Sequence, residues 1–454
     1  MLTFNESHRS AAQHHQQQQS RNQSGPCGIT KAQTRDFCRK MSYWCQTPQS
    51  PVGKSLLQLV SAIKYLSWEA VEERLKTNPE DCFDKDSFGV TALNHCIRKR
   101  HTDVPLHIIE RIIEINPGAI ILKDKMTGFN ALHLAVDTDN IHVVKIILNK
   151  STEAATSKCK DGKLPIHFAK SEQVAKLLID KNPTGLGHLS KSGHLPLFSA
   201  CLNDDVRPEV IETIIQAGSK FRIGQQYSNE VSCRSCGGVL VKDSYGDTPI
   251  KIIFRRILFV NTSIQDDMDS RLWGKLCIVL KYTYLALHGY QFCDGSITIP
   301  MIHALIECGA NPKIVQYVIK RYPNEVIKRD EFGKTPLSIA ASKVDTMPEI
   351  IEILLKAEKN NKCGIVRSAR MTDNEKRLPL HLAVESGRTW VNGVENIVVA
   401  EPLALETRDI KTKMYPFMLA AVPSYKWDNT CYDTIYTLLR AAPHVVKAYC
   451  KDYQ

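Results

Sequence analysis

The sequence lacks the features of a membrane or secreted protein. No uncharged apolar run reaches about 18 residues, the length that a spanning helix needs. The first residues, MLTFNESHRS, have no basic segment followed by an apolar stretch, as a secretory signal would. The 15 cysteines are scattered through apolar contexts rather than set in a disulfide framework. We therefore expect reduced thiols and an intracellular protein, in the cytoplasm or nucleus, with no membrane contact.

Motifs of the common catalytic classes are also missing. The sequence has no glycine-rich phosphate loop, HExxH, GxSxG or protein-kinase signature. It also lacks a block of five or six basic residues, although 59 basic minus 48 acidic residues leave a net charge of +11. We expect no catalytic residues and no cofactor, and weak nucleic-acid binding is the last of three hypotheses because the charge is diffuse.

The first 50 residues differ in composition from the rest of the chain. They include a His/Gln tract at residues 14–19 and few aliphatic side chains, too few to offset the entropy of ordering by burial. We predict a disordered N-terminal tail over residues 1–50. The whole chain is 43% apolar and 24% charged, which is typical of a folded protein, so residues 51–454 are expected to fold.

A short phrase recurs nine times in residues 51–454, for example KTPLSIA at 334–340 and RLPLHLA at 377–383. Successive copies lie between 31 and 53 residues apart, and seven of the nine have Ala four residues after the Pro or its substitute. About fourteen residues after the Pro or its substitute, several units carry apolar pairs at helical spacing, such as Ile350-Ile351 and Leu354-Leu355. Each unit therefore predicts two short helices, the basis of a repeat array.

Turns between the units have their own pattern, Asp-x-x-Gly, which begins at Asp86, Asp243 and Asp330. The Asp side chain accepts backbone amide hydrogens, and Gly adopts the positive φ that other residues resist. With the helix start Thr-Pro-Leu-His-x-Ala, this pattern resembles the ankyrin repeat. The resemblance implies an all-α ankyrin-repeat solenoid of nine to ten units over residues 51–454, with insertions near 218–242 and 256–275 and a first capping unit at 55–80.

The resemblance implies a surface for another macromolecule rather than a catalytic pocket. We expect a non-catalytic, monomeric scaffold or adaptor that binds a protein through the groove between the turns and the first helices. Phe88, Tyr245 and Phe332 each precede a turn Gly and are candidate partner-binding residues, unless they pack on the neighbouring turn. A series of lysines near the turns either favours an acidic peptide or only maintains solubility.

An alternative hypothesis rests on Cys233-Arg-Ser-Cys236-Gly-Gly, in the longest step between repeats. Two thiolates at this spacing are half of a zinc site, and no second Cys-x-x-Cys completes it. With Asp266, Asp267 and Asp269 nearby in sequence, this segment suggests a metal-dependent regulator or enzyme, but we expect an unliganded loop. His133, His167 and His381 recur at the repeat period, which favours a structural role over a catalytic one.

Overall fold

The structure is a computed structural model that describes residues 54–65, 67–98, 104–224, 236–260, 270–290, 299–360, 367–422 and 429–445. Within them, ten helix pairs follow one another: α3 (Lys54–Lys64) and α4 (Trp68–Thr77); α5 (Ala92–Ile97) and α6 (Leu106–Ile115); α7 (Ala131–Asp137) and α8 (Ile141–Lys150); the 3-10 helix η4 (Pro165–Phe168) and α9 (Glu172–Lys181); α10 (Pro196–Leu202) and α11 (Pro208–Lys220); α12 (Pro249–Val260) and α13 (Ser270–Leu287); α14 (Met301–Glu307) and α15 (Pro312–Arg321); α16 (Pro336–Ser342) and α17 (Pro348–Asn360); α18 (Pro379–Glu385) and α19 (Val394–Ala400); α20 (Pro416–Ala420) and α21 (Asn429–Ala441).

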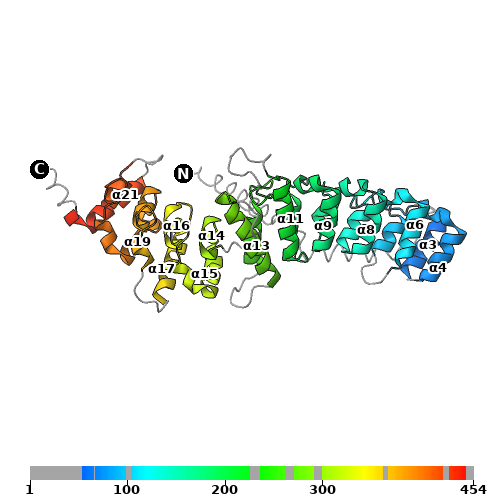
Figure 1. The fold of residues 1–454 in the computed structure, drawn as a ribbon, viewed down its shortest axis with the longest axis horizontal. Coiled ribbons are helices and arrows are strands. Elements are labelled where there is room, and N and C mark those ends of the chain that lie inside the picture. The colour runs from blue at the N-terminus through cyan, green and yellow to red at the C-terminus, as the bar shows by residue number, and fades with distance from the viewer. Residues whose placement is uncertain are drawn as a thin grey trace, which may run out of the picture.

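The pairs stand side by side in chain order and form one elongated row (Figure 1). The described residues contain no β-strand, and one isolated bridge joins Lys85 to Thr91. The prediction of an all-α repeat array is therefore confirmed. Residues 1–50, for which we predicted a tail, lie outside the described part of the chain.

The core runs the length of the row as a continuous apolar layer. Each second helix buries its predicted stripe, so that Ile350, Ile351 and Leu354 of α17 are at most 2% exposed. Most first helices bury a small residue, as at Ala135 and Ala340, where a larger side chain would push neighbouring helices apart. Burial of these two faces explains why a unit needs its neighbours in order to fold.

Proline begins a further element after five of the second helices. Proline cannot continue the helix before it, and each of these prolines starts a 3-10 turn. These turns are η1 (Pro79–Phe83), η2 (Pro117–Ile120), η5 (Pro183–Gly187), η7 (Pro323–Ile327) and η10 (Pro402–Glu406). They carry the chain from the end of one helix pair toward the next turn.

Packing of the row changes after α13. First helices of neighbouring pairs pack closely throughout the described chain, for example α10 on α12 and α14 on α16, except that α13 rather than α12 packs on α14. Helix α12 has 12 residues and α13 has 18, whereas α10 has 7. Residues 256–260 and 270–275, within one predicted insertion, thus extend these two helices. Residues 225–235 and 261–269 lie outside the described part.

Candidate functional site

The turns between helix pairs form one edge of the row, and an Asp side chain shapes each of the predicted ones. Oδ1 of Asp330 accepts hydrogen bonds from the backbone N–H of Phe332 at 2.9 Å and of Lys334 at 2.7 Å. Asp243 accepts from Tyr245 and Asp247, both at 2.9 Å. The glycines that close these turns, Gly333 and Gly246, have φ of +72° and +80°. The predicted turn chemistry is confirmed.

Backbone hydrogen bonds also join five pairs of neighbouring turns. The N–H of Lys125 donates to the carbonyl oxygen of Phe88 at 2.7 Å, and the N–H of Asn374 donates to that of Phe332 at 3.0 Å. Equivalent bonds run from Lys160 to Thr127, from Lys191 to Asp161 and from Ser244 to Ser192. Because the backbones are joined directly, the tips of the turns are held in a fixed row.

The three predicted partner-binding residues lie at the tips of these turns. Tyr245 is 62% exposed and Phe332 is 48% exposed, whereas Phe88 is half-buried. The ring of Phe332 stacks on His288 with centroids 5.6 Å apart. Tyr245 therefore fits the description of a projecting anchor best, and Phe332 combines exposure with packing. Their role in binding stays a prediction.

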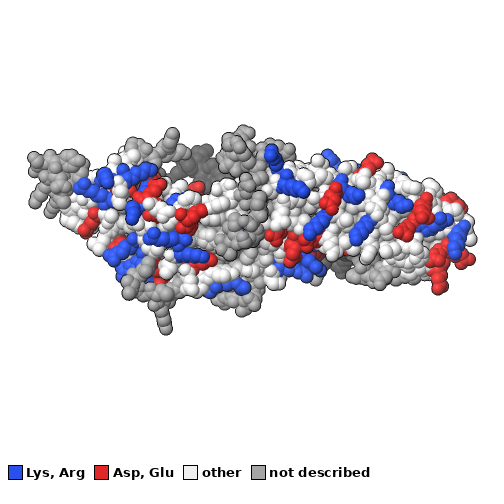
Figure 2. Space-filling view, viewed as in Figure 1, with Lys and Arg blue, Asp and Glu red and all other residues white. Residues whose placement is uncertain are grey.

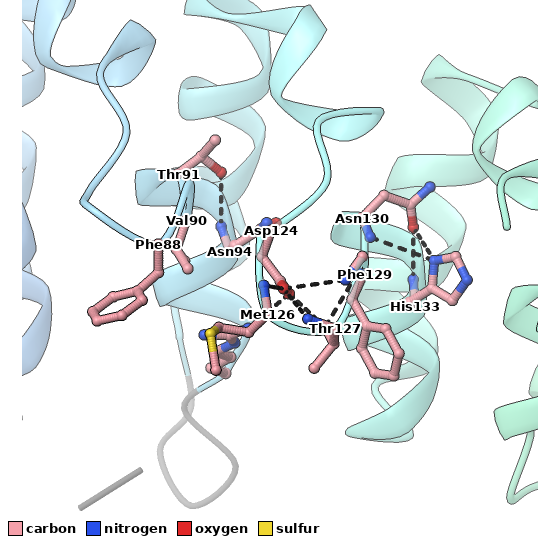
Figure 3. Close-up of polar contacts among 12 residues, drawn as sticks. Phe88, Val90, Thr91, Asn94, Asp124, Met126, Thr127, Phe129, Asn130 and His133 are labelled. Atoms are coloured by element: carbon pink, nitrogen blue, oxygen red, sulfur yellow. Dashed lines mark hydrogen bonds and ion pairs between the residues drawn. The ribbon is translucent and has the colours of Figure 1, made fainter. Parts of the chain in front are cut away.

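A fourth apolar side chain belongs to the same row and was missed in the sequence. Met126 is 58% exposed, and its N–H donates to Oδ1 of Asp124 at 2.9 Å, as the N–H of Phe88 does to Asp86. Phe88 and Met126 project to the same side of their turns (Figure 3). The turn from Asp124 to Gly128 has one residue more than Asp-x-x-Gly, so the motif did not reveal it.

The recurring histidines join neighbouring repeats, as expected of a structural role. Nε2–H of His167 donates to the carbonyl oxygen of His194 at 3.3 Å, while its Nδ1 accepts from the N–H of Leu164 at 3.1 Å. His381 makes the same kind of bridge, at 2.9 Å from the carbonyl oxygen of Thr407. Burial lowers the pKa of His167 to about 3, which keeps the ring neutral.

Cys236, half of the Cys-x-x-Cys pair, lies inside the core rather than at a surface. It is 4% exposed, and its Sγ lies 3.9 Å from the carbonyl oxygen of Ile223. A Cβ atom at Gly237 would overlap the carbonyl oxygen of Ile215, so this glycine allows close packing on α11. Cys233 lies outside the described residues, as do Asp266, Asp267 and Asp269, and the metal hypothesis stays untested. Among the described residues, no three His, Cys, Asp or Glu side chains are grouped to hold a metal ion.

The surface also carries a shallow hollow away from the turns. A depression of about 320 Å³ lies on the opposite edge, between loops that join first to second helices. Its lining is Asp139, Ile141, Ser171, Glu172, Gln173, Arg207 and Glu209. On the face shown in Figure 2, basic and acidic side chains are interspersed along the row, which does not resemble the continuous basic stripe of a nucleic-acid binder. No helix in the described chain is long and apolar enough to cross a membrane.

Comparison with protein families identifies the repeats. A model of three ankyrin repeats matches residues 301–398, and a model of a single ankyrin repeat matches residues 127–157. The chain contains ankyrin repeats. The three-repeat match includes the turn of Phe332, and the single-repeat match begins at residue 127, within the turn of Met126. Proteins with ankyrin repeats typically bind other proteins and are typically non-catalytic.

Other comparisons add no function. No curated protein matches the chain. One solved structure with similarity is described as a predatory endopeptidase from Bdellovibrio bacteriovorus in complex with an immunity protein. The similarity spans 44% of this chain and 91% of that chain, at 17% identity and a TM-score of 0.34.

Proposed function

We propose that this protein is a non-catalytic scaffold or adaptor that binds another protein through the edge of its turns and the adjacent first helices. In this proposal it acts as an intracellular monomer. The observation that carries the proposal is the set of apolar side chains at corresponding places on the turns, of which Met126, Tyr245 and Phe332 are exposed, each on a turn that a backbone hydrogen bond joins to a neighbouring turn. Rigid aromatic side chains lose little entropy on binding and contribute a large share of interface energy.

The fixed positions of the turn tips favour a binding role for these apolar side chains over chance exposure at the surface. Scattered exposed apolar residues are common on any protein, but Phe88, Met126, Tyr245 and Phe332 occupy corresponding places in four turns. Adding a Cβ atom at Gly128 would place it 2.8 Å from the backbone nitrogen of Lys160, so neighbouring turns are closely fitted. A partner would meet a preformed surface, with little ordering cost on this side.

The proposal is tested by affinity capture with the full chain from cell extract, followed by mass spectrometry. We expect the variant Phe88→Ala/Tyr245→Ala/Phe332→Ala to lose at least one captured protein by about 30-fold, as hot-spot truncations do. The matched control, Tyr65→Ala/Val399→Ala/Tyr436→Ala, removes side chains that are 77%, 69% and 66% exposed away from the turns. Equal capture by both variants, with thermal melting showing that both are folded, would contradict the proposal.

A further inference from the structure

Three lysines occupy the same place in three consecutive turns. Lys125, Lys160 and Lys191 each follow the first residue of their turn, and the backbone N–H of each donates to the preceding turn at 2.7 to 2.9 Å. All three side chains are exposed. We call these three residues the lysine row. The stacking of the repeats sets the distance between neighbouring lysines of the row, because the backbone of each lysine is bonded to the preceding turn.

The stems of these lysines are held in place by glycines. A Cβ atom at Gly89 would lie 3.2 Å from Cγ of Lys125, and one at Gly162 would lie 3.4 Å from Cγ of Lys191. The same relation, at 3.1 Å, joins Gly128 to Lys160. Each aliphatic stem thus packs across the bare glycine of the preceding turn, which fixes where the stem leaves the backbone. The ammonium group of Lys125 also lies 3.5 Å from the carbonyl oxygen of Ser87, to which it donates.

The charge of the lysine row is not neutralised by its surroundings. Among the described residues, no ion pair joins Lys125, Lys160 or Lys191 to an acidic side chain. The carboxylate of Asp124, by contrast, pairs with Arg98 at 3.0 Å. Asp161 is the exposed acid of the middle turn and lies beside Lys160 in sequence. The row therefore presents three separate positive charges around one negative charge.

The lysine row ends sharply at both sides. The corresponding residue is Ser87 in the turn before it and Ser244 in the turn after it, and Glu331 in a later turn. A lysine series that only maintained solubility would not need to fall in three adjacent turns. The restriction indicates a ligand that spans three repeats of the N-terminal half.

Resting on the proposed function, we infer that the lysine row binds an extended acidic segment of a partner protein, with a carboxylate at every third residue. Neighbouring helices pack about 8–10 Å apart, which sets the repeat spacing of the row. A peptide in the extended polyproline II conformation rises about 3.1 Å per residue and has three residues per turn, so every third side chain lies on the same face, about 9 Å from the next. The two periods match. The peptide residues between the carboxylates can be uncharged, so they can contact Met126 and lie beside Asp161 without electrostatic repulsion.

Two other occupants fit the row less well. The chain's own residues 1–53 contain six basic and two acidic residues, a balance of 6 − 2 = +4, and the row would repel them. A single-stranded nucleic acid carries a phosphate at every nucleotide, so its continuous charge would also meet Asp161. A peptide can place a neutral residue there.

Fluorescence anisotropy with the full chain tests the inference. One labelled peptide carries three glutamates at every third position among Gly, Ser and Ala, and a second has the same composition with the three glutamates adjacent. We expect the spaced peptide to bind about tenfold more tightly, as three exposed ion pairs of moderate strength allow. Binding should weaken as salt rises from about 50 to about 200 mM.

Two triple variants provide the matched comparison. Lys125→Gln/Lys160→Gln/Lys191→Gln should lose the difference between the peptides. Lys145→Gln/Lys150→Gln/Lys181→Gln removes the same charge from exposed lysines of α8 and α9 and should retain it. Equal binding of the two peptides, equal loss in both variants, or tighter binding of a thymidine tetranucleotide would overturn the inference.

The outcome is separable from the proposed function. Should the peptides fail while the turn-tip variant still loses its captured protein, the edge binds a partner of another chemistry. Should the tip variant capture normally, the proposed function fails whatever the peptides do.

Discussion

Lys275 and Arg388 occupy corresponding places in two repeats, although one lies in helix α13 and the other in a loop. Lys275 Nζ donates to the carbonyl oxygens of Ala200 and Asn203 at 3.2 and 2.5 Å. Arg388 Nη2 donates to those of Ala340 and Lys343 at 2.9 and 2.5 Å. In both cases the proline that begins the first helix of the preceding repeat is the reference point, and the acceptors are the fourth and seventh residues after it.

The length of a neighbouring loop explains these buried cations. Residues 203–207 join α10 to α11 and residues 343–347 join α16 to α17, whereas only residues 138–140 join α7 to α8. A longer loop leaves carbonyl groups at the end of the first helix without backbone partners. A cation from the next repeat satisfies them, and both side chains are at most 2% exposed.

We predict that Arg388→Met lowers the free energy of unfolding by about 3 kcal/mol, because it leaves buried carbonyl groups without a charged donor. Arg388→Lys should recover part of that loss. Urea denaturation followed by circular dichroism measures both variants. The exposed Lys313 is the control, since Lys313→Met should change stability by no more than about 0.5 kcal/mol. A loss from Arg388→Met as small as that of the control would contradict the capping role.

Glycines in the turns provide a second prediction. Gly246→Ala should cost about 1 kcal/mol, because φ is +80° while no atom lies within 4 Å of the new Cβ. Gly128→Ala has a similar φ of +73° and in addition meets the backbone nitrogen of Lys160 at 2.8 Å. We expect its cost to be larger by about 1 kcal/mol or more. Thermal melting of the two variants compares them, and equal losses would show that the turns are not closely fitted.

Buried histidines predict a loss of stability in weak acid. Burial lowers the pKa of His133 to about 4 and of His167 to about 3, from an ordinary value of 6.5. Between pH 6.5 and those values the unfolded chain binds protons that the folded chain does not. The free energy of unfolding should therefore fall as pH falls below 6.5, by at most about 1.4 kcal/mol per pH unit for each ring.

Denaturation at a series of pH values between about 7 and about 4.5 tests this sign. His167→Gln should make the slope shallower, since it removes one of the titrating rings. Replacement of the exposed His142 by Gln is the control and should leave the slope as it is. A wild-type protein whose stability rises on acidification through this range would contradict the structural role of the histidines.

The change in packing after α13 predicts where the row divides on unfolding. Trp273 of α13 lies across this junction, stacked on Tyr322 with centroids 6.4 Å apart and edge-on to Tyr317 at 5.9 Å. The guanidinium of Arg321 lies 5.2 Å from the same ring. We predict that Trp273→Ala separates denaturation into two transitions, one for each half of the row.

Calorimetry shows whether one or two transitions occur. The control is Trp68→Ala, which removes a half-buried tryptophan from the first helix pair and should lower stability without dividing the transition. A single transition in Trp273→Ala would show that α13 and α14 alone couple the two halves.

Much of the fold followed from local regularities in the sequence. The apolar pairs of the second helices, the small residue of the first helices and the Asp-x-x-Gly turns are each determined by contacts that recur in several repeats. Lys376 is an exception to this pattern, because it adopts a φ of +63° at the position where other turns have glycine. Periodicity predicts the average unit and does not predict such exceptions.

Features formed between distant parts of the chain could not be predicted. Lys275 lies 75 residues from Ala200 in sequence, and no motif links a lysine of one helix to the loop of another repeat. The lysine row was visible only as a loose series near the turns, since its distinguishing feature is the packing of each stem on a glycine of the previous turn. Met126 was missed for a local reason, an extra residue in its turn.

Site-specific photo-crosslinking tests the central claim most directly. A benzoylphenylalanine at position 126 or 245 places the probe on the turn edge, and at position 145 or 316 it lies on exposed sites of second helices α8 and α15. We predict that the same protein is crosslinked from both turn positions and from neither helix position. Crosslinks that form from the helix positions alone would contradict binding through the turns.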